Sequence, residues 1–358
     1  MTPLAKKLGL RLPLIQAPMA GGPSSRELVA AASDAGALGS FGFAYTQPDE
    51  MKRQAEWVRG KTGRPFGINL FVSPQPDPVA PARQAQALEA VSGYYRELGL
   101  PTPEPVRAPY APDLEAQLRA VEEIRPAVFT VHLGGLTADE VKRFQSKGIA
   151  VGGSANCVAE AKGLEAAGFD FVIAQGGEAG GHRGSYLRDP YQSLTGTLAL
   201  TRLIVRAVKV PVVAAGGIMD GAGIAAVLAL GAQAAQLGTA FIPCPESGAS
   251  QVHKDLLVKL TEDETAITEK FSGKPARGIV NRFMKEMAGA PQLAFPAQNS
   301  VTGKLRAASA QAGKPDFIAL WAGQAAPLSR ALPAAQLIAR LEQELAASLR
   351  QAAALLKE

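Results

Sequence analysis

Residues 175–184 read QGGEAGGHRG, and this glycine-rich stretch decides how the rest of the chain is interpreted. It directly follows the apolar run 171–174, whose β-branched residues are typical of a buried strand. Its five glycines permit positive φ angles and let a ligand approach bare backbone amides. His182 lies among them, and a histidine there is suited to proton transfer because its unperturbed pKa is near physiological pH. The stretch therefore predicts an active-site loop, and a flexible turn with an incidental histidine is the weaker alternative.

The composition limits the class of protein. The chain has 358 residues, 47% of them hydrophobic, which is enough for one large core and a small second domain. Its net charge is +5, but Lys and Arg alternate with Asp and Glu, and no basic run is interleaved with aromatic residues. Nucleic-acid binding is therefore not expected.

The cysteines and the apolar stretches indicate the cellular compartment of the protein. Cys157 and Cys244 have no metal-ligand or redox spacing, so we expect neither a metal site nor a disulfide framework. Residues 1–16 lack the apolar stretch of a signal peptide, and no apolar run is long enough to span a membrane. The sequence predicts a soluble cytoplasmic protein.

Short apolar runs alternate with Ala-rich amphipathic stretches over residues 1–246. The predicted strands are residues 14–16, 38–41, 66–71, 128–132, 149–152, 171–175, 212–215 and 234–238. The predicted helices are residues 25–35, 49–60, 114–124, 138–147, 158–167, 198–208 and 222–230. This alternation is typical of an α/β fold, a (β/α)8 TIM barrel, with a doubly wound sheet as the alternative.

The positions of the polar and glycine motifs favour the barrel, because TIM-barrel active sites lie at the carboxyl ends of the strands. Such motifs follow or end the predicted strands at Ala17, Pro18, Met19, Asn69, His132, Ser154, Gln175, Gly217, Gln236, Gly238 and Thr239. The loops after the last two strands bind phosphate in many barrels, so a phosphate-bearing ligand is expected. A doubly wound sheet would need a glycine fingerprint after its first strand, which Gly21 and Gly22 match poorly.

Three segments depart from the alternation. Residues 73–112 are rich in proline, with a helix predicted at 83–98, and are interpreted as an insertion at the barrel mouth. Residues 247–315 show helical patterns at 253–270 and 276–287 and no convincing strand, which predicts a mainly helical second domain over the barrel. Residues 316–358 should return to the barrel. Their helix, 334–356, carries an apolar stripe suited to docking, formed by Leu337, Leu341, Leu345 and Leu349.

Together these motifs resemble the nitronate monooxygenases, once called 2-nitropropane dioxygenases, and the class I group in particular. The resemblance runs from QAPM at 16–19 through NLF at 69–71 to LWAGQ at 320–324, and residues 175–184 are its most specific part. It implies a barrel that binds FMN non-covalently and a catalytic base at His182. By position it implies FMN contacts from Asn69, Gln175, Gly180, Gly217, Gln236, Gly238 and Thr239, with Ala17, Pro18 and Met19 beside the flavin ring.

The resemblance also implies a reaction. An alkyl nitronate, such as propionate 3-nitronate, would reduce the flavin, which would pass electrons to O2 through a flavin semiquinone. The products would be a carbonyl compound and nitrogen oxides. The flavin would carry the redox chemistry while the protein positions it. A neutral nitroalkane must first lose its α-proton to a base such as His182, whereas a pre-formed nitronate needs only orientation or charge pairing.

Two other functions compete with this one. The core EAGGH, residues 178–182, also occurs in flavin-dependent enoyl-acyl-carrier-protein reductases, which would use FMN with NAD(P)H. The third possibility is a barrel that binds a flavin or phosphate without turnover, but such a protein has no use for a base at His182. The stretches at 69–71 and 321–324 are more similar to the monooxygenases.

Several residues have two interpretations. His132 either contacts substrate or is a hydrogen-bonded histidine of the core. Ser154 either contacts substrate or belongs to an ordinary turn. Trp321 either packs in the core or forms a platform for a ligand. Both a monomer and a homodimer are compatible with the sequence, and so is closure of the second domain as a lid.

Three charged or ionisable residues lie close to these motifs or on a predicted helix. Arg183 either attracts an anionic substrate or pairs with a surface acid. Glu178 is expected to accept backbone amide bonds more readily than it acts as a base. His253 is expected to be solvated on its helix.

Overall fold

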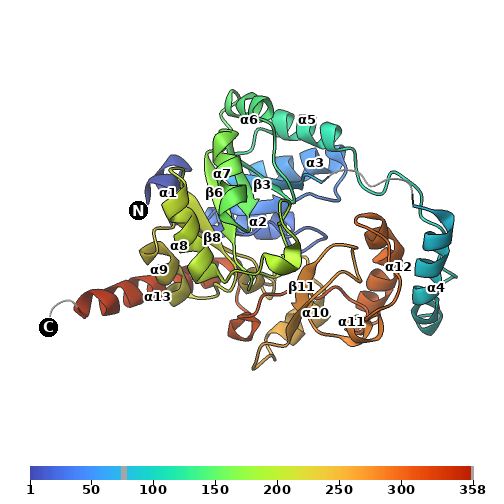
Figure 1. The fold of residues 1–358 in the computed structure, drawn as a ribbon. Coiled ribbons are helices and arrows are strands. Elements are labelled where there is room, and N and C mark those ends of the chain that lie inside the picture. Colours follow the sequence, from blue (N-terminus) through green and yellow to red (C-terminus); the bar gives the residue numbers. More distant parts are fainter. Residues whose placement is uncertain (74–78, 356–358) are drawn as a thin grey trace.

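Eight parallel strands form the centre of the computed structural model, which describes residues 1–73 and 79–355. Around the ring they are β1 (Leu14–Gln16), β2 (Gly39–Gly42), β3 (Phe66–Phe71), β4 (Val128–His132), β5 (Ala150–Ala155), β6 (Phe171–Gln175), β8 (Val212–Ala215) and β9 (Ala234–Leu237). Hydrogen bonds between β1 and the backbone of Leu38 close the ring. The protein is an α/β TIM barrel, which confirms the predicted fold class (Figure 1).

Helices surround the barrel. They are α2 (Arg26–Asp34), α3 (Pro48–Arg59), α5 (Leu114–Ile124), α6 (Ala138–Gln145), α7 (Val158–Ala166), α8 (Thr197–Ala207) and α9 (Gly221–Ala229). The eighth position is taken by the C-terminal helix α13 (Ala334–Ala354), which contacts both α9 and α2. The eighth β/α unit is therefore split, because residues 238–333 lie between β9 and its helix.

The leucine stripe of α13 explains how this last helix is attached. Leu337 and Leu341 are buried against the barrel, and Leu345 is partly buried there. Leu349 is 48% exposed, and the end of the helix extends away from the barrel (Figure 1). The stripe therefore serves docking over its first two turns.

The amino ends of the strands are closed by the N-terminal segment. Leu4, in α1 (Pro3–Lys7), packs with Val128 and Phe171, which begin β4 and β6. A Cβ on Gly152 would lie 2.3 Å from the Phe171 ring, so this strand position has to be glycine. A closed, packed amino end leaves only the carboxyl ends of the strands for a site.

Residues 247–333, here called the cap, lie between β9 and α13. They form α10 (Gln251–Leu257), β10 (Thr265–Thr268), β11 (Ala276–Ile279), α11 (Arg282–Glu286) and α12 (Ala297–Gln311). The prediction that residues 247–315 contain no strand was wrong. β10 and β11 pair antiparallel, and β7 (Gly181–His182), from the barrel loop, extends their sheet.

The strands of the cap escaped prediction because they are short and carry polar residues. β11 reads ARGI, yet all four of its residues are buried. The guanidinium of Arg277 donates to the carbonyl of Gly177, so its charge is stabilised by hydrogen bonding inside the protein. A four-residue strand with an arginine lacks the apolar alternation that predicts a buried strand.

The predicted insertion contains α4 (Pro81–Glu97), which packs on the cap. Ala87, Val91 and Tyr95 of α4 share a core with Val301 and Leu305 of α12, and Figure 1 shows the two helices side by side. Residues 74–78, within this insertion, lie outside the described residues. In the part of the chain that is described, no helix is both long and apolar enough to cross a membrane.

Candidate active site

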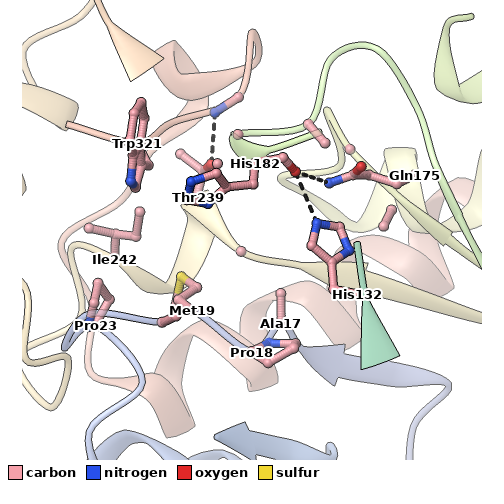
Figure 2. A pocket seen from close by; sticks show the side chains of 18 of the residues that line it. Ala17, Pro18, Met19, Pro23, His132, Gln175, His182, Thr239, Ile242 and Trp321 are labelled. Carbon is pink, nitrogen blue, oxygen red and sulfur yellow. Dashed lines mark hydrogen bonds between the residues drawn. The ribbon is translucent and has the colours of Figure 1, made fainter. Parts of the chain in front are cut away.

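A cavity of about 390 Å³ lies at the carboxyl ends of the barrel strands, between the barrel and the cap. Every residue that the sequence assigned to the site lines it: Ala17, Pro18, Met19, Asn69, His132, Ser154, Gln175, Gly180, His182, Gly217, Gln236, Gly238 and Thr239. The cap adds lining residues that include Ser272, Arg306 and Trp321. Figure 2 shows Ala17, Pro18 and Met19 on one side of the cavity and Trp321 across from them.

The loop 175–184 is held rigidly between two sheets. It leaves β6 at Gln175 and enters the cap sheet as β7, where His182 pairs with Ala276. A Cβ on Gly180 would lie 2.5 Å from the carbonyl carbon of Ala322, and Gly181 has a φ of +74°. Close packing and backbone conformation therefore require these glycines, and the loop is not a flexible turn.

Arg183 and Glu178 hold this loop from inside. The fully buried Arg183 guanidinium donates to the carbonyls of Gly176 (2.7 Å), Gln175 (3.2 Å) and Ser193 (3.1 Å). Burial lowers the pKa of Arg183 to about 10, so it stays charged at neutral pH. Neither predicted role of Arg183 is observed, because its partners are backbone carbonyls.

Glu178 caps a helix, as its position among the glycines predicted. Its carboxylate accepts hydrogen bonds from the amide (2.7 Å) and the hydroxyl (2.8 Å) of Thr197, the first residue of α8. A carboxylate at a helix N-terminus satisfies a free amide and interacts favourably with the helix dipole. These bonds occupy the carboxylate, which favours the structural interpretation over the catalytic one.

His182 is surrounded by aromatic rings. The centroids of Phe71, Phe295 and Trp321 lie 5.5, 5.7 and 5.7 Å from that of the imidazole. Burial lowers the pKa of His182 to about 3, and the charges of Lys274 and Arg306 act in the same direction. The imidazole is therefore neutral at physiological pH and has the protonation state that a base requires.

His132 orients the backbone of His182. Its Nε2 lies 3.1 Å from the His182 carbonyl oxygen, which also accepts a hydrogen bond from Gln175 Nε2 at 3.0 Å (Figure 2). Burial lowers the pKa of His132 to about 4, so it too is neutral. A carbonyl only accepts, which means that the proton of His132 is on Nε2. His132 thus lines the cavity wall and is hydrogen-bonded within the protein, and its contact with substrate stays a prediction.

The cap contributes a cation that the sequence analysis missed. Arg306 of α12 donates from Nη2 to the Asn299 side-chain oxygen (2.7 Å) and from Nε to the Thr302 hydroxyl (3.2 Å). No carboxylate pairs with Arg306 among the residues that the structure describes. Arg306 and Asn299 both line the cavity, and no motif marked either of them in the sequence.

Tyr45 was also missed, although its position gave a signal. It lies three residues after β2, at the same barrel end as the other site residues. Its hydroxyl is buried and has no hydrogen-bond partner in the described part of the chain. Burial raises the pKa of Tyr45 to about 12, so the phenol is neutral and can donate a hydrogen bond to a ligand.

The loops after β8 and β9 suit a phosphate. The amides of Gly217, Gly238 and Thr239 have no protein acceptor among the described residues, and all three residues line the cavity. Free backbone amides in a glycine loop bind anions. Asn69 donates to Thr130, which leaves its side-chain oxygen available to a ligand. With the apolar side chains of residues 17–19, the cavity has both polar and apolar groups for a phosphate-bearing ligand.

Comparisons with known proteins identify the family. The sequence profile of the nitronate monooxygenases matches residues 2–344. The chain belongs to the nitronate monooxygenase family. It is 42% identical to the nitronate monooxygenase of Pseudomonas aeruginosa over 343 residues, which cover 94% of this chain and 97% of that one. The predicted family resemblance is thereby confirmed.

Solved structures agree with this membership. A nitroalkane oxidase from Streptomyces ansochromogenes matches with a TM-score of 0.90 and 39% identity over 97% of this chain and 99% of that one. FabK from Thermotoga maritima matches with a TM-score of 0.77 and 27% identity over 99% of each chain. Nitronate monooxygenases are oxidoreductases, in general flavin enzymes, that act on small molecules, so the prediction of an enzyme is confirmed.

His253 contradicts the prediction of a solvated helix residue. It is 5% exposed, lines the cavity, and its Nε2 has no hydrogen-bond partner among the described residues. His253 and Leu257 are four residues apart, so they share one face of α10, and that face is buried. The spacing was the available signal, but the surrounding charged residues obscured it.

The three histidines of this nitronate monooxygenase family member make it sensitive to acid. Burial lowers the pKa values of His132, His182 and His253 to about 4, 3 and 4. In the unfolded chain a histidine titrates at about 6.5. Because the unfolded state binds protons first, the stability that the neutral histidines contribute is complete above about pH 6.5 and is lost as the pH falls towards 4.

We predict that His253→Gln reduces this acid sensitivity. Between about pH 6.5 and pH 5, the free energy of unfolding of the variant should fall by roughly 1.5 kcal/mol less than that of the wild type. Urea unfolding at each pH measures this difference. The offset between the two proteins above about pH 7.5 reports the packing cost of the substitution and serves as the internal control. Parallel pH profiles would contradict the prediction.

Proposed function

We propose that the protein is an FMN-dependent nitronate monooxygenase that oxidises alkyl nitronates with O2 to carbonyl compounds and nitrogen oxides. The observation that carries the proposal is that one cavity contains a neutral imidazole, that of His182, and a guanidinium, that of Arg306, which has no carboxylate partner among the described residues. When bound, FMN supplies the electron transfer from the substrate to oxygen. The residues of the chain bind and orient the flavin and the substrate, and they exclude water from the site.

FMN would lie along the barrel end of the cavity. The amides of Gly217, Gly238 and Thr239 would bind its phosphate, since they have no acceptor in the described part of the chain. Ala17, Pro18 and Met19 would support the ring, while polar contacts would come from Asn69, Gln175, Gly180 and Gln236, all of which line the cavity. A single phosphate site is what separates FMN from a dinucleotide.

His182 would act as the base for neutral nitroalkanes. The imidazole is neutral because it is buried, so a ring nitrogen has a lone pair for the α-proton. Phe71, Phe295 and Trp321 exclude water from this exchange. Once the proton has moved, the anionic nitronate would stay beside His182, where the positive charge of Lys274 also acts. The cavity therefore favours the substrate in its anionic form.

Arg306 and Tyr45 would bind a second anionic group. A partly buried guanidinium without an acidic partner, and a buried phenol hydroxyl without any partner in the described part of the chain, are costly unless a ligand satisfies them. Propionate 3-nitronate, with its nitronate at one end and its carboxylate at the other, has the required pair of anionic groups. The substrate of an enoyl reductase is a neutral conjugated carbonyl, which would leave the charge of Arg306 unpaired.

The assignment of FMN is tested at Gly238. Its φ is −105°, and an added Cβ would lie 3.5 Å from the Ala17 Cβ, so a side chain is tolerated there. Gly238→Asp places a carboxylate beside the phosphate, and Gly238→Asn is the matched neutral control. We predict that the Asp variant binds FMN at least about tenfold more weakly than the Asn variant, a difference of about 1.4 kcal/mol. Titration of the apoprotein with FMN measures both, and equal affinities would refute the phosphate site.

The role of Arg306 is tested with two substrates of equal chain length. We predict that Arg306→Met lowers kcat/KM for propionate 3-nitronate by about 10–100-fold, the range expected when a hydrogen bond to a charged group is lost. For propyl 1-nitronate, which lacks the carboxylate, the change should stay within about threefold. Arg306→Lys, which keeps the charge, should recover part of the loss. Equal losses on both substrates would show that Arg306 does not recognise the carboxylate.

A further inference from the structure

We propose that Ser272 is a positioning residue that fixes the tautomer of His182, with the ring proton on Nε2 and the lone pair on Nδ1. Only the effect of this tautomer on the rate of the reaction rests on the proposed function. The tautomer itself is a property of the folded protein. No residue type in the sequence around Ser272 suggested this role.

Three hydrogen-bonding groups meet at the Ser272 hydroxyl. His182 Nε2 lies 2.9 Å from Ser272 Oγ, and the Lys274 carbonyl oxygen lies 3.1 Å from it. The Lys274 amide lies 3.4 Å from the same oxygen. Ser272 is 1% exposed, so these groups cannot exchange their partners for bulk water.

Counting protons at this oxygen selects one tautomer. A serine hydroxyl has one proton to donate and two lone pairs that accept. The Lys274 carbonyl can only accept, so the hydroxyl proton is directed to it. The two lone pairs are then left for the Lys274 amide and for a proton on His182 Nε2. With this arrangement all of the groups around Ser272 are satisfied.

The other tautomer leaves groups unsatisfied. If Nε2 had no proton, the hydroxyl would donate to the ring, and the Lys274 carbonyl would lose the partner that the structure gives it. The proton on Nδ1 would then have no acceptor, since Nδ1 makes no hydrogen bond to the described residues. His182 lines the cavity, so Nδ1 is the nitrogen available to a ligand.

The position of Ser272 is itself fixed by the cap. It lies in the connection between β10 and β11, and β11 is the strand that pairs with β7 at His182. The neighbouring carbonyls of Phe271 and Lys270 accept hydrogen bonds from Thr302 (2.6 Å) and Gln298 (2.9 Å) of α12. The same hairpin thus holds the backbone of His182 and orients its ring.

This arrangement has a consequence for catalysis. With the proton held on Nε2, the Nδ1 lone pair faces the cavity and can take the α-proton of a neutral nitroalkane. The resulting imidazolium keeps its Nε2–H bond to Ser272, so no hydrogen bond in the wall of the site needs to be rearranged. A pre-formed nitronate does not need this step.

Nuclear magnetic resonance of the FMN-loaded enzyme, with ¹⁵N-labelled histidine, reads the tautomer directly. The chain has three histidines, and the His182 signals are identified by their loss in His182→Ala. We expect a protonated Nε2 and an unprotonated Nδ1 in the wild type and in Ser272→Thr. In Ser272→Ala the His182 signals should move to a mixture of the tautomers. A proton on Nδ1 in the wild type, or unchanged signals in Ser272→Ala, would overturn the proposal.

Kinetics on the same proteins separate the positioning role of Ser272 from the catalytic role of His182. Ser272→Ala should lower kcat for a neutral nitroalkane by about 10–100-fold, which is less than the roughly 10²–10⁴-fold that a general base contributes, because the base itself is retained. Turnover of the matching nitronate should change by less than about threefold, and Ser272→Thr should restore both rates. Full nitroalkane activity in His182→Ala would refute the catalytic role in the proposed function and leave the tautomer result standing. Equal losses of Ser272→Ala on both substrate forms would overturn the positioning role.

Discussion

The pairing of two residues of β7 with β11 is the constraint on which the rest of the site depends. Strand β6 belongs to the barrel, and β11 belongs to the cap, so the loop between Gln175 and His182 connects two separate sheets. Neither end of the loop can move without breaking backbone hydrogen bonds. The buried guanidinium of Arg183 completes this attachment by donating hydrogen bonds to carbonyls of the loop and of Ser193. A histidine presented on such a loop has a defined position relative to both walls of the cavity.

Burial and charge together determine what the cavity binds. Arg183 and Arg277 are buried, but their guanidinium groups are engaged by backbone carbonyls and hydroxyls, and they stabilise the structure. Arg306 differs because its charge borders the cavity and has no acid beside it among the described residues. Burial keeps His182 neutral, and the charge of Arg306 acts in the same direction. In the proposed function, this positive electrostatic field would also favour an anionic ligand.

Most of the barrel was predictable from the sequence, and much of the cap was not. Barrel strands such as residues 171–175 are continuous apolar runs because parallel strands are buried on both faces, and this pattern is visible without a structure. The site residues of the barrel were found because they follow those strands. Strand β11 was missed because its arginine is satisfied by a distant carbonyl, and such compensation has no local signature. Arg306 and Ser272 reach the cavity from the cap, whose packing on the barrel is a tertiary property.

The most direct test of the proposed function is the absorbance of the flavin in the FMN-loaded enzyme without oxygen. One sample is mixed with propionate 3-nitronate and a second sample with NADPH. If the protein is a nitronate monooxygenase, the nitronate reduces the flavin within the time of turnover, and NADPH reduces it slowly or not at all. Rapid bleaching by NADPH, with no response to the nitronate, would contradict the account and identify the protein as a reductase.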